Sequence, residues 1–172
     1  LEAVSQLSRS SLAEVRSTVT RLRIPDFSGE IQASERALQT ASVTAKLPDA
    51  ERALSAVGVN SSLFSWVLRE AVTNIVRHSQ AGFCEVRVSN TGLEILDNGV
   101  GIPAEYAAGS GIKGMKSRVE SAGGTLIIED APVHWLRAHP AGYGAVDIRG
   151  TRVRVSMDVN TAEIEPSGDT DD

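Results

Sequence analysis

Residues 61–79, SSLFSWVLREAVTNIVRHS, contain the pattern on which the fold assignment depends. Their apolar residues recur with helical spacing and share one broad face: Phe64, Leu68, Ala71, Val72, Ile75 and Val76. Polar residues lie on the opposite face, at offsets of four, seven and eight from the first of them: Glu70, Asn74, Arg77 and His78. The stretch therefore predicts a helix that packs on a core and presents a polar cluster on its other side.

Two glycine-rich segments follow this helix. DNGVG, residues 97–101, comes at the end of a β-rich run, and GSGIKGM, residues 109–115, opens a helical run. Asp97 at a strand end can accept a hydrogen bond from an adenine amino group. Gly99 and Gly101 let the backbone turn sharply and lie close to the base. The backbone amides of the second segment stand at the start of a helix, where they suit phosphate charge.

The polar face of the helix offers groups that complement magnesium and phosphate. Asn74 presents a neutral oxygen, and Mg²⁺ takes few protein ligands and keeps waters. Glu70, one turn earlier on the same face, could orient water or accept a proton. Arg77 and His78 could meet the phosphates. Together with the glycine-rich segments, these residues predict a site for Mg-ATP.

The pattern G-x-G-x-x-G at Gly109, Gly111 and Gly114 is weak by itself, and its surroundings exclude three common nucleotide sites. A dinucleotide fingerprint needs an apolar strand directly before the first glycine, but PAEYAA stands there. A Walker loop needs G-x-x-x-x-G-K-[ST], and Met115 follows the last glycine. The lysine and H-R-D motifs of eukaryotic-type kinases are absent from the sequence. The pattern gains meaning only from the other two segments.

The rest of the chain alternates between helices, strands and loops. We expect helices over residues 1–23, 29–40, 61–79 and 112–122. We expect strands over 42–48, 125–130 and 151–159, and a hairpin over 84–99 whose turn contains Asn90, Thr91 and Gly92. The remaining segments are predicted as a connector up to residue 60, a loop over 98–110, a loop or insertion over 131–150, and an acidic disordered tail.

Composition limits the class of protein. The chain has 172 residues, 41% hydrophobic and only 4% aromatic, which predicts one domain plus an appendage with a mostly aliphatic core. A net charge of −5 argues against nucleic acid or an anionic membrane as the main partner. The single cysteine, Cys84, fits a reducing cytoplasm, and its place in a β-like run predicts a buried thiol. No run approaches about 18 apolar residues, and the start at Leu1 suggests a piece of a longer protein.

The three ordered segments resemble the ATP-binding domain of bacterial sensor histidine kinases, within the superfamily of gyrase, Hsp90, histidine kinase and MutL. REAVTNIVRH, residues 69–78, resembles the asparagine box, and DNGVGIP, residues 97–103, the first glycine box. GSGIKGMKSRVESAGG, residues 109–124, resembles the second glycine box, and GTRVRVSM, residues 150–157, the final strand. The form of these boxes is similar to the subfamily that pairs with response regulators of the helix-turn-helix type.

The resemblance implies an α+β fold of the Bergerat type, a two-layer α/β sandwich in which helices cover one face of a mixed sheet, preceded by an N-terminal helical stub. It places residues 1–40 in the dimerisation and phosphotransfer helices, as part of the second helix of a hairpin. Residues 41–160 would form the ATP-binding domain, and 161–172 the disordered acidic tail.

The resemblance also implies roles for individual residues. Asn74 would bind Mg²⁺, with Glu70 as a second candidate ligand, and these two residues are the candidate catalytic pair. Asp97 would bind adenine. The candidate nucleotide-binding residues are Asn74, Arg77, His78, Asp97, Gly99, Gly101, Ile102, Gly109, Gly111, Ile112, Gly114 and Met115.

The implied activity is transfer of the γ-phosphoryl group of ATP to a histidine and then to an aspartate of a cognate response regulator. The histidines of this chain, His78, His134 and His139, all lie outside the N-terminal helix, so we expect the acceptor histidine in a part of the protein beyond this chain. The full-length protein would be a homodimer through its helical hairpin. The chain would be a cytoplasmic domain without a nucleic-acid partner, attached to a membrane only through upstream segments.

Two other readings remain open. A serine kinase of the anti-sigma-factor type has similar boxes and would phosphorylate a separate protein, although the N-terminal helix argues against it. A module that binds nucleotide without catalysis is the other, and the intact boxes argue against that. The stretch over 131–150 departs from the family, which usually has a few turn residues there; we expect an exposed loop, with a partner contact as the alternative.

Overall fold

The centre of the protein is a mixed five-stranded sheet, seen in a computed structural model that describes residues 26–101, 110–140 and 148–157. The strands are β1 (Thr44–Lys46), β2 (Phe83–Val88), β3 (Gly92–Asp97), β4 (Gly124–Asp130) and β5 (Thr151–Met157). Their order across the sheet is β1-β2-β3-β5-β4. Among the described strands, β1 and β2 pair in parallel, and the other neighbouring strands pair antiparallel.

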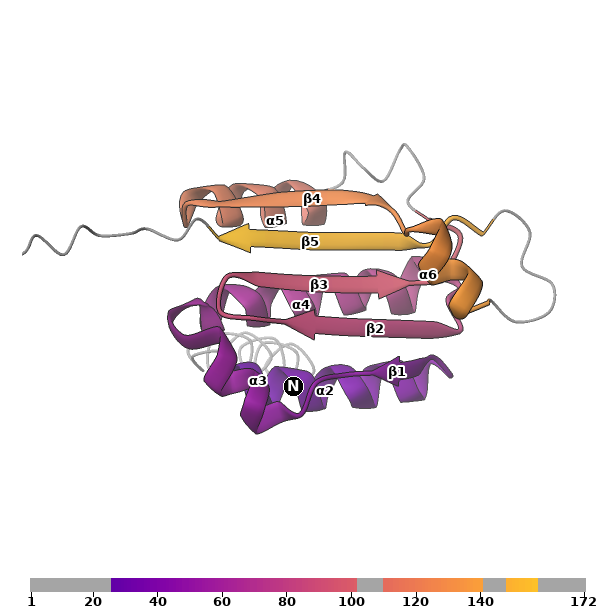
Figure 1. Ribbon diagram of the computed structural model, residues 1–172, viewed down its shortest axis with the longest axis horizontal. Helices are drawn as coiled ribbons and strands as arrows, with labels where there is room; N and C mark the ends of the chain where they lie inside the picture. Colours follow the sequence, from indigo (N-terminus) through magenta and orange to yellow (C-terminus); the bar gives the residue numbers. More distant parts are fainter. Residues whose placement is uncertain (1–25, 102–109, 141–147, 158–172) are drawn as a thin grey trace, which may run out of the picture.

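Helices cover one face of this sheet. The helices α2 (Phe27–Thr40), α4 (Ser61–Asn74) and α5 (Ser110–Ser121) lie along that face, as Figure 1 shows. The short helix α3 (Ala50–Val57) and the 3-10 turn Gly58–Asn60 connect β1 to α4. The predicted α+β class, a two-layer sandwich around a mixed sheet, is confirmed.

The core lies between α4 and the sheet and follows the periodicity of the sequence. Phe64, Val67 and Leu68 of α4 are fully buried, as the helical spacing requires. On β3 the pattern alternates, so that Leu93 and Ile95 point into this core while Leu96 belongs to a separate cluster on the other face. Burial of the apolar face thus fixes which side of α4 remains available for polar side chains.

The helix α2 belongs to the same folded unit as the sheet. Phe27, Ile31 and Leu38 lie in the core that α4 and the strands share. Arg69 of α4 also forms an ion pair with the buried Glu30 of α2. The helix α2 therefore packs as part of the two-layer sandwich.

Three segments differ from their predicted secondary structure. The expected connector before residue 60 contains α3, which Asp49 caps by accepting a hydrogen bond from the backbone amide of Arg52. The helix over 61–79 is α-helical only to Asn74 and ends in a π-helical turn, η2 (Ile75–Ser79). The expected loop over 131–150 contains a helix, α6 (Val133–Ala138).

The other predicted elements have their expected kind. The hairpin of β2 and β3 is confirmed, with the amide of Ser89 donating to the carbonyl of Gly92 across its turn. Cys84 is fully buried, also as predicted. The predicted helix over 1–23, most of the loop over 98–110 and the predicted tail lie outside the described residues. No helix within the described ranges is long and apolar enough to cross a membrane.

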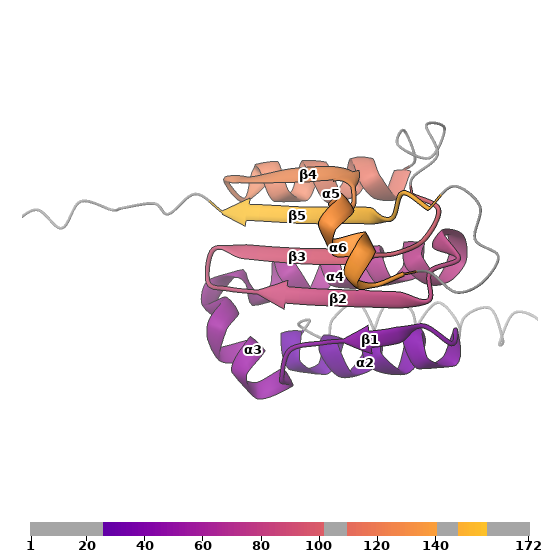
Figure 2. The ribbon, with the colours of Figure 1, turned by 45° about the vertical axis from the view of Figure 1, so that its right-hand side comes forward.

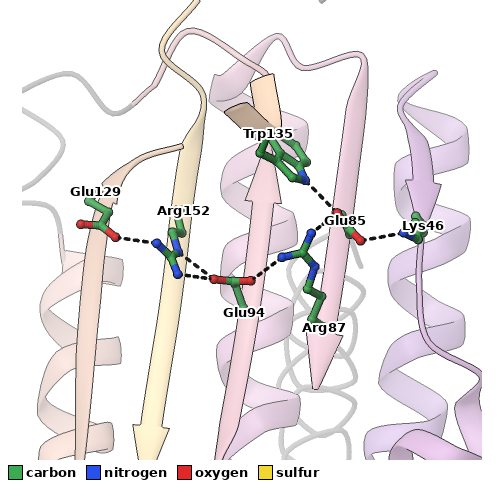
Figure 3. A network of polar contacts seen from close by, with 7 residues as sticks. All are labelled: Lys46, Glu85, Arg87, Glu94, Glu129, Trp135 and Arg152. Atoms are coloured by element: carbon green, nitrogen blue, oxygen red, sulfur yellow. Dashed lines mark hydrogen bonds and ion pairs between the residues drawn. The ribbon is translucent and has the colours of Figure 1, made fainter. Parts of the chain in front are cut away.

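The face of the sheet opposite α4 carries charged residues and α6 (Figures 2 and 3). Arg87 bridges Glu85 and Glu94, and Arg152 joins Glu94 to Glu129. Trp135 of α6 donates its indole N–H to Glu85 at 2.7 Å. The ring of Trp135 is buried in the apolar cluster of this face. The hydrogen bond from Trp135 to Glu85 and this apolar cluster therefore both hold α6 against the sheet.

Glu85 is the buried centre of this network. Burial alone would raise the pKa of its carboxyl group, but hydrogen bonds from Arg87, Trp135 and Lys46 outweigh burial and lower the pKa to about 2. The carboxylate is therefore charged and fully engaged by neighbouring donors. Glu85 is a structural group of this face.

Candidate functional site

A cavity of about 410 Å³ opens between α4, α5 and the strands β3 and β5. Many of the predicted site residues line it together: Glu70, Asn74, Arg77, His78, Asp97, Gly101, Gly111, Ile112 and Met115. Gly99 and Gly114 do not line it, and Ile102 and Gly109 lie outside the described residues. The fold thus brings residues from three separated segments of the sequence to one cavity.

The end of α4 supplies the polar side of the cavity. Glu70 and Asn74 are half-buried on successive turns, whereas Arg77 and His78 are exposed within the π turn that follows. A π turn adds a residue to one turn of a helix and often occurs at functional sites. The cavity therefore presents a carboxylate and an amide in its interior and a cationic side chain at its opening.

Asp97 supplies the buried polar group at the other end of the cavity. It is the last residue of β3 and is only 3% exposed. Its carboxylate accepts hydrogen bonds from the amide of Gly99, at 2.8 Å, and from Thr151. Burial raises the pKa of Asp97 to about 6, although these hydrogen bonds oppose the rise. No ion pair to Asp97 forms within the described part of the chain, so its charge remains largely uncompensated.

Apolar side chains form the walls between these two polar ends: Ile95, Ile112, Met115, Ile128 and Val153. Walls of this kind suit a flat, weakly polar ring, and a single buried carboxylate can fix the orientation of that ring by accepting its N–H groups. The arrangement therefore fits a ligand with an aromatic amine at one end and an anionic group at the other.

Two glycines allow the strand end at Asp97 to contact its neighbours through backbone atoms. A Cβ at Gly99 would lie 2.1 Å from the carbonyl oxygen of Ser79, and a Cβ at Gly150 would lie 2.4 Å from the carbonyl oxygen of Asp97. The amide of Gly150 also donates to the carbonyl of Gly99 at 2.8 Å. The role predicted for Gly99 is therefore refined, because Gly99 shapes the site from outside the cavity by permitting contact with the end of the π turn.

The glycines of α5 also lie against α4. A Cβ at Gly111 would be 2.1 Å from a carboxylate oxygen of Glu70, so Gly111 lets the start of α5 approach that side chain. A Cβ at Gly114 would be 3.5 Å from the ring of Trp66, over which the guanidinium of Arg118 also lies at 4.4 Å. Gly114 thus faces the contact between the helices, while Gly111 faces the cavity.

The helix α6 reaches the same strand end from the opposite face of the sheet. The Oδ1 atom of Asn98 accepts hydrogen bonds from the amides of Gly82 and Phe83. Its Nδ2 atom donates a hydrogen bond to the carbonyl of His139 at 3.0 Å. The ring of His139 stacks on Phe83 with centroids 4.4 Å apart. The residue next to Asp97 therefore joins β2, β3 and the end of α6.

Sequence patterns did not identify several residues that line the cavity. Ser79 and Thr151 are small polar residues that reach it from the π turn and from the start of β5. Their neighbours in the chain give no signal, because their partners, Gly99 and Asp97, lie far away in the sequence. The GT pair at residues 150–151 is a local pattern, but it predicts only the start of the final strand.

Comparisons with known proteins agree on one family. Residues 60–161 match the family described as histidine kinase-, DNA gyrase B-, and HSP90-like ATPase. The chain is 32% identical over 127 residues to the sensor histidine kinase YvfT of Bacillus subtilis, covering 72% of this chain and 34% of that protein. It is 31% identical over 135 residues to the sensor histidine kinase DesK of the same organism, covering 75% of this chain and 36% of that protein. The chain thus spans about a third of the length of these curated relatives.

Among solved structures, the histidine kinase AdeS of Acinetobacter baumannii has a TM-score of 0.48 and 17% sequence identity. The match covers 91% of this chain and 80% of that one.

We predict that Gly99→Ala destabilises the protein by about 2–4 kcal/mol, since the new methyl group would overlap the carbonyl of Ser79. Gly29→Ala is the matched control, because the nearest atom to its Cβ would be 4.0 Å away. The control should change the free energy of unfolding by no more than about 1 kcal/mol. Urea denaturation measures both values, and equal stabilities of the two variants would contradict the close contact.

The raised pKa of Asp97 predicts a pH dependence of stability in the absence of nucleotide. Because the folded state holds the proton up to about pH 6 and the unfolded state releases it near the ordinary value of 3.8, stability falls as the pH rises through this window. Relative to Asp97→Asn, the wild type should lose about 2–3 kcal/mol between pH 4 and pH 7. Denaturation of both proteins across this range measures the difference, and a difference independent of pH would show that Asp97 titrates normally.

Proposed function

The chain belongs to the histidine kinase-, DNA gyrase B-, and HSP90-like ATPase family, because residues 60–161, more than half of the chain, match that family, and we propose that the cavity of this chain binds Mg-ATP.

One observation carries the assignment of the adenine end. Asp97 is a buried carboxylate that lines this largely apolar-walled cavity, and within the described ranges its hydrogen bonds come from Gly99 and Thr151. An exocyclic amino group of adenine would supply a further donor to a carboxylate that burial leaves poorly solvated. The apolar walls would hold the two faces of the base.

The end of α4 is assigned to the phosphates and to magnesium. Within the described ranges no group of three or more His, Cys, Asp or Glu could hold a metal ion. Mg²⁺ bound through the amide oxygen of Asn74, with Glu70 as a second candidate, would take its remaining ligands from phosphate and water. Arg77 and His78 stand at the opening of the cavity, where they would meet phosphate oxygens.

The proposed activity is that of a protein histidine kinase in a two-component system. Bound Mg-ATP would supply a γ-phosphoryl group to a histidine outside this chain and then to an aspartate of a response regulator. Glu70 would orient the incoming acceptor or accept its proton, and Asn74 would hold the metal, so that the chain acts mainly by positioning and charge neutralisation. This activity agrees with the curated relatives, which are named sensor histidine kinases.

The partners follow from this activity. A cognate response regulator would receive the phosphoryl group, and the full-length protein would dimerise through its helical hairpin. The chain would act as a cytoplasmic domain of a protein that is either cytoplasmic or anchored to the inner membrane.

We predict that the chain binds Mg-ATP or Mg-ADP with a Kd between ~1 μM and ~1 mM. Asp97→Asn should weaken ATP binding roughly 5- to 150-fold, because its amide presents a donor where the adenine amino group needs an acceptor. Isothermal titration calorimetry of both proteins measures the change.

The control for this titration is Asp130→Asn, the same chemical change at the exposed end of β4 and outside the cavity. It should bind ATP like the wild type. No binding by the wild type at millimolar nucleotide would overturn the proposal, and equal affinity in Asp97→Asn would remove Asp97 from the adenine site.

The protein that contains this chain should label itself on histidine when it is given radiolabelled ATP and Mg²⁺. Asn74→Ala should reduce labelling by about two orders of magnitude by removing a metal ligand, whereas Asn90→Ala, in the exposed hairpin turn, should not. Phosphohistidine is recognised by its stability in base and its loss in acid. Phosphoserine on a separate protein would instead support the anti-sigma-factor type, and nucleotide binding without any labelling would support a sensing module.

A further inference from the structure

Ser79 stands where the π turn meets the strand end that carries Asp97. It is the last residue of η2, is 5% exposed and lines the cavity. The next residue, Gln80, has a left-handed backbone with φ 53°, so the chain reverses direction directly after Ser79. Both the helix end and the reversal therefore depend on the groups around this serine.

The hydroxyl of Ser79 satisfies two backbone groups at this reversal. It donates to the carbonyl of Ile75 at 2.9 Å and accepts the amide of Ala81 at 3.1 Å. A helix end leaves such carbonyls and amides without partners inside the helix, and their burial without a partner is unfavourable. The hydroxyl thus holds both sides of the turn, which spans the residues that follow Asn74.

The backbone of Ser79 contacts the other half of the site. The carbonyl of Ser79 accepts a hydrogen bond from the amide of Val100 at 2.9 Å. Gly99 packs against the same carbonyl and leaves no room there for a Cβ. Gly99 in turn donates its amide to the carboxylate of Asp97 at 2.8 Å. Two hydrogen bonds and one backbone contact therefore connect the end of α4 to the adenine end of the cavity.

We propose that Ser79 is a positioning residue that sets the distance and orientation between the two ends of the nucleotide site. It thereby holds Asn74, Arg77 and His78 at the distance from Asp97 that a bound nucleotide requires. The inference rests on the proposed function, because it assigns the two ends to phosphate and adenine. The binding of a ligand that spans both ends depends on this distance and orientation, and the binding of a ligand that contacts one end does not.

The structure supplies a matched control in α4, the helix that η2 continues. Ser65 is fully buried and donates its hydroxyl to the carbonyl of Ser61 at 2.7 Å, four residues earlier, as Ser79 does to Ile75. Ser65 does not line the cavity. Replacing either serine by alanine removes a hydroxyl hydrogen bond to the carbonyl four residues earlier. Ser79→Ala also removes the hydrogen bond from the amide of Ala81, and on the proposal it is this variant that loosens the connection between the two ends.

The test measures the Kd of Mg-ATP and of adenosine for the wild type, Ser79→Ala and Ser65→Ala. Adenosine engages the Asp97 end alone, and NMR titration measures its weak binding. Ser79→Ala should weaken Mg-ATP binding about tenfold and adenosine binding less than about threefold. Ser65→Ala should leave the ratio of the two Kd values as in the wild type, whatever it does to stability.

Ser79→Cys extends the test to a side chain of similar size that bonds more weakly. Its loss of Mg-ATP affinity should lie between those of the wild type and Ser79→Ala, and it replaces Ser79→Ala if that variant does not fold. Equal losses for Mg-ATP and adenosine, or unchanged Mg-ATP affinity in a folded variant, would overturn the inference. Absence of Mg-ATP binding by the wild type would overturn the proposed function instead, and the inference with it.

Discussion

The contact between the backbone of Ser79 and Gly99 is the constraint on which the site depends. The end of the π turn and the end of β3 approach so closely that a single methyl group on Gly99 would overlap a carbonyl oxygen. On its other side the same strand end meets Gly150, whose missing side chain lets β5 follow β3 into the sheet. Because these contacts are made by main chain, they leave little freedom in how α4, β3 and β5 sit relative to one another.

Two buried carboxylates on opposite faces of the sheet show how environment divides structural from functional roles. Glu85 on β2 has donors on every side, so its pKa falls and its hydrogen-bonding capacity is used within the protein. Asp97 on the neighbouring strand has fewer donors, and burial raises its pKa. A buried group that remains incompletely satisfied is a candidate for binding a ligand, and one that is fully paired is not.

The sequence predicted those elements whose signal is local. The helical spacing in 61–74 and the alternation on either side of Asn90 are set by burial of one face, and both are confirmed by the structure. The nine cavity-lining residues predicted from the three segments were also found through local motifs. The cap at Asp49 and the short apolar pattern after it are local too, and they predict the helix α3 where a connector is expected.

The remaining features depend on contacts between distant residues. The π turn Ile75–Ser79 ends against Gly99, which lies far along the chain. The helix α6 is fixed through Trp135 to Glu85, fifty residues away. Thr151 reaches the cavity only because β5 pairs with β3. No window of sequence contains both partners of these contacts.

The strand order has a consequence for how the protein is made. Of the strands that the structure describes, β5 is synthesised last, yet it lies between β3 and β4 in the sheet. During translation β4 emerges before the only strand of the described sheet with which it pairs, and Thr151 and Val153, which complete the cavity, emerge later still. A nascent chain that ends before β5 therefore lacks the strand that joins β3 to β4 and two residues of the cavity lining. A ligand that needs the complete cavity could stabilise the fold only after β5 has left the ribosome.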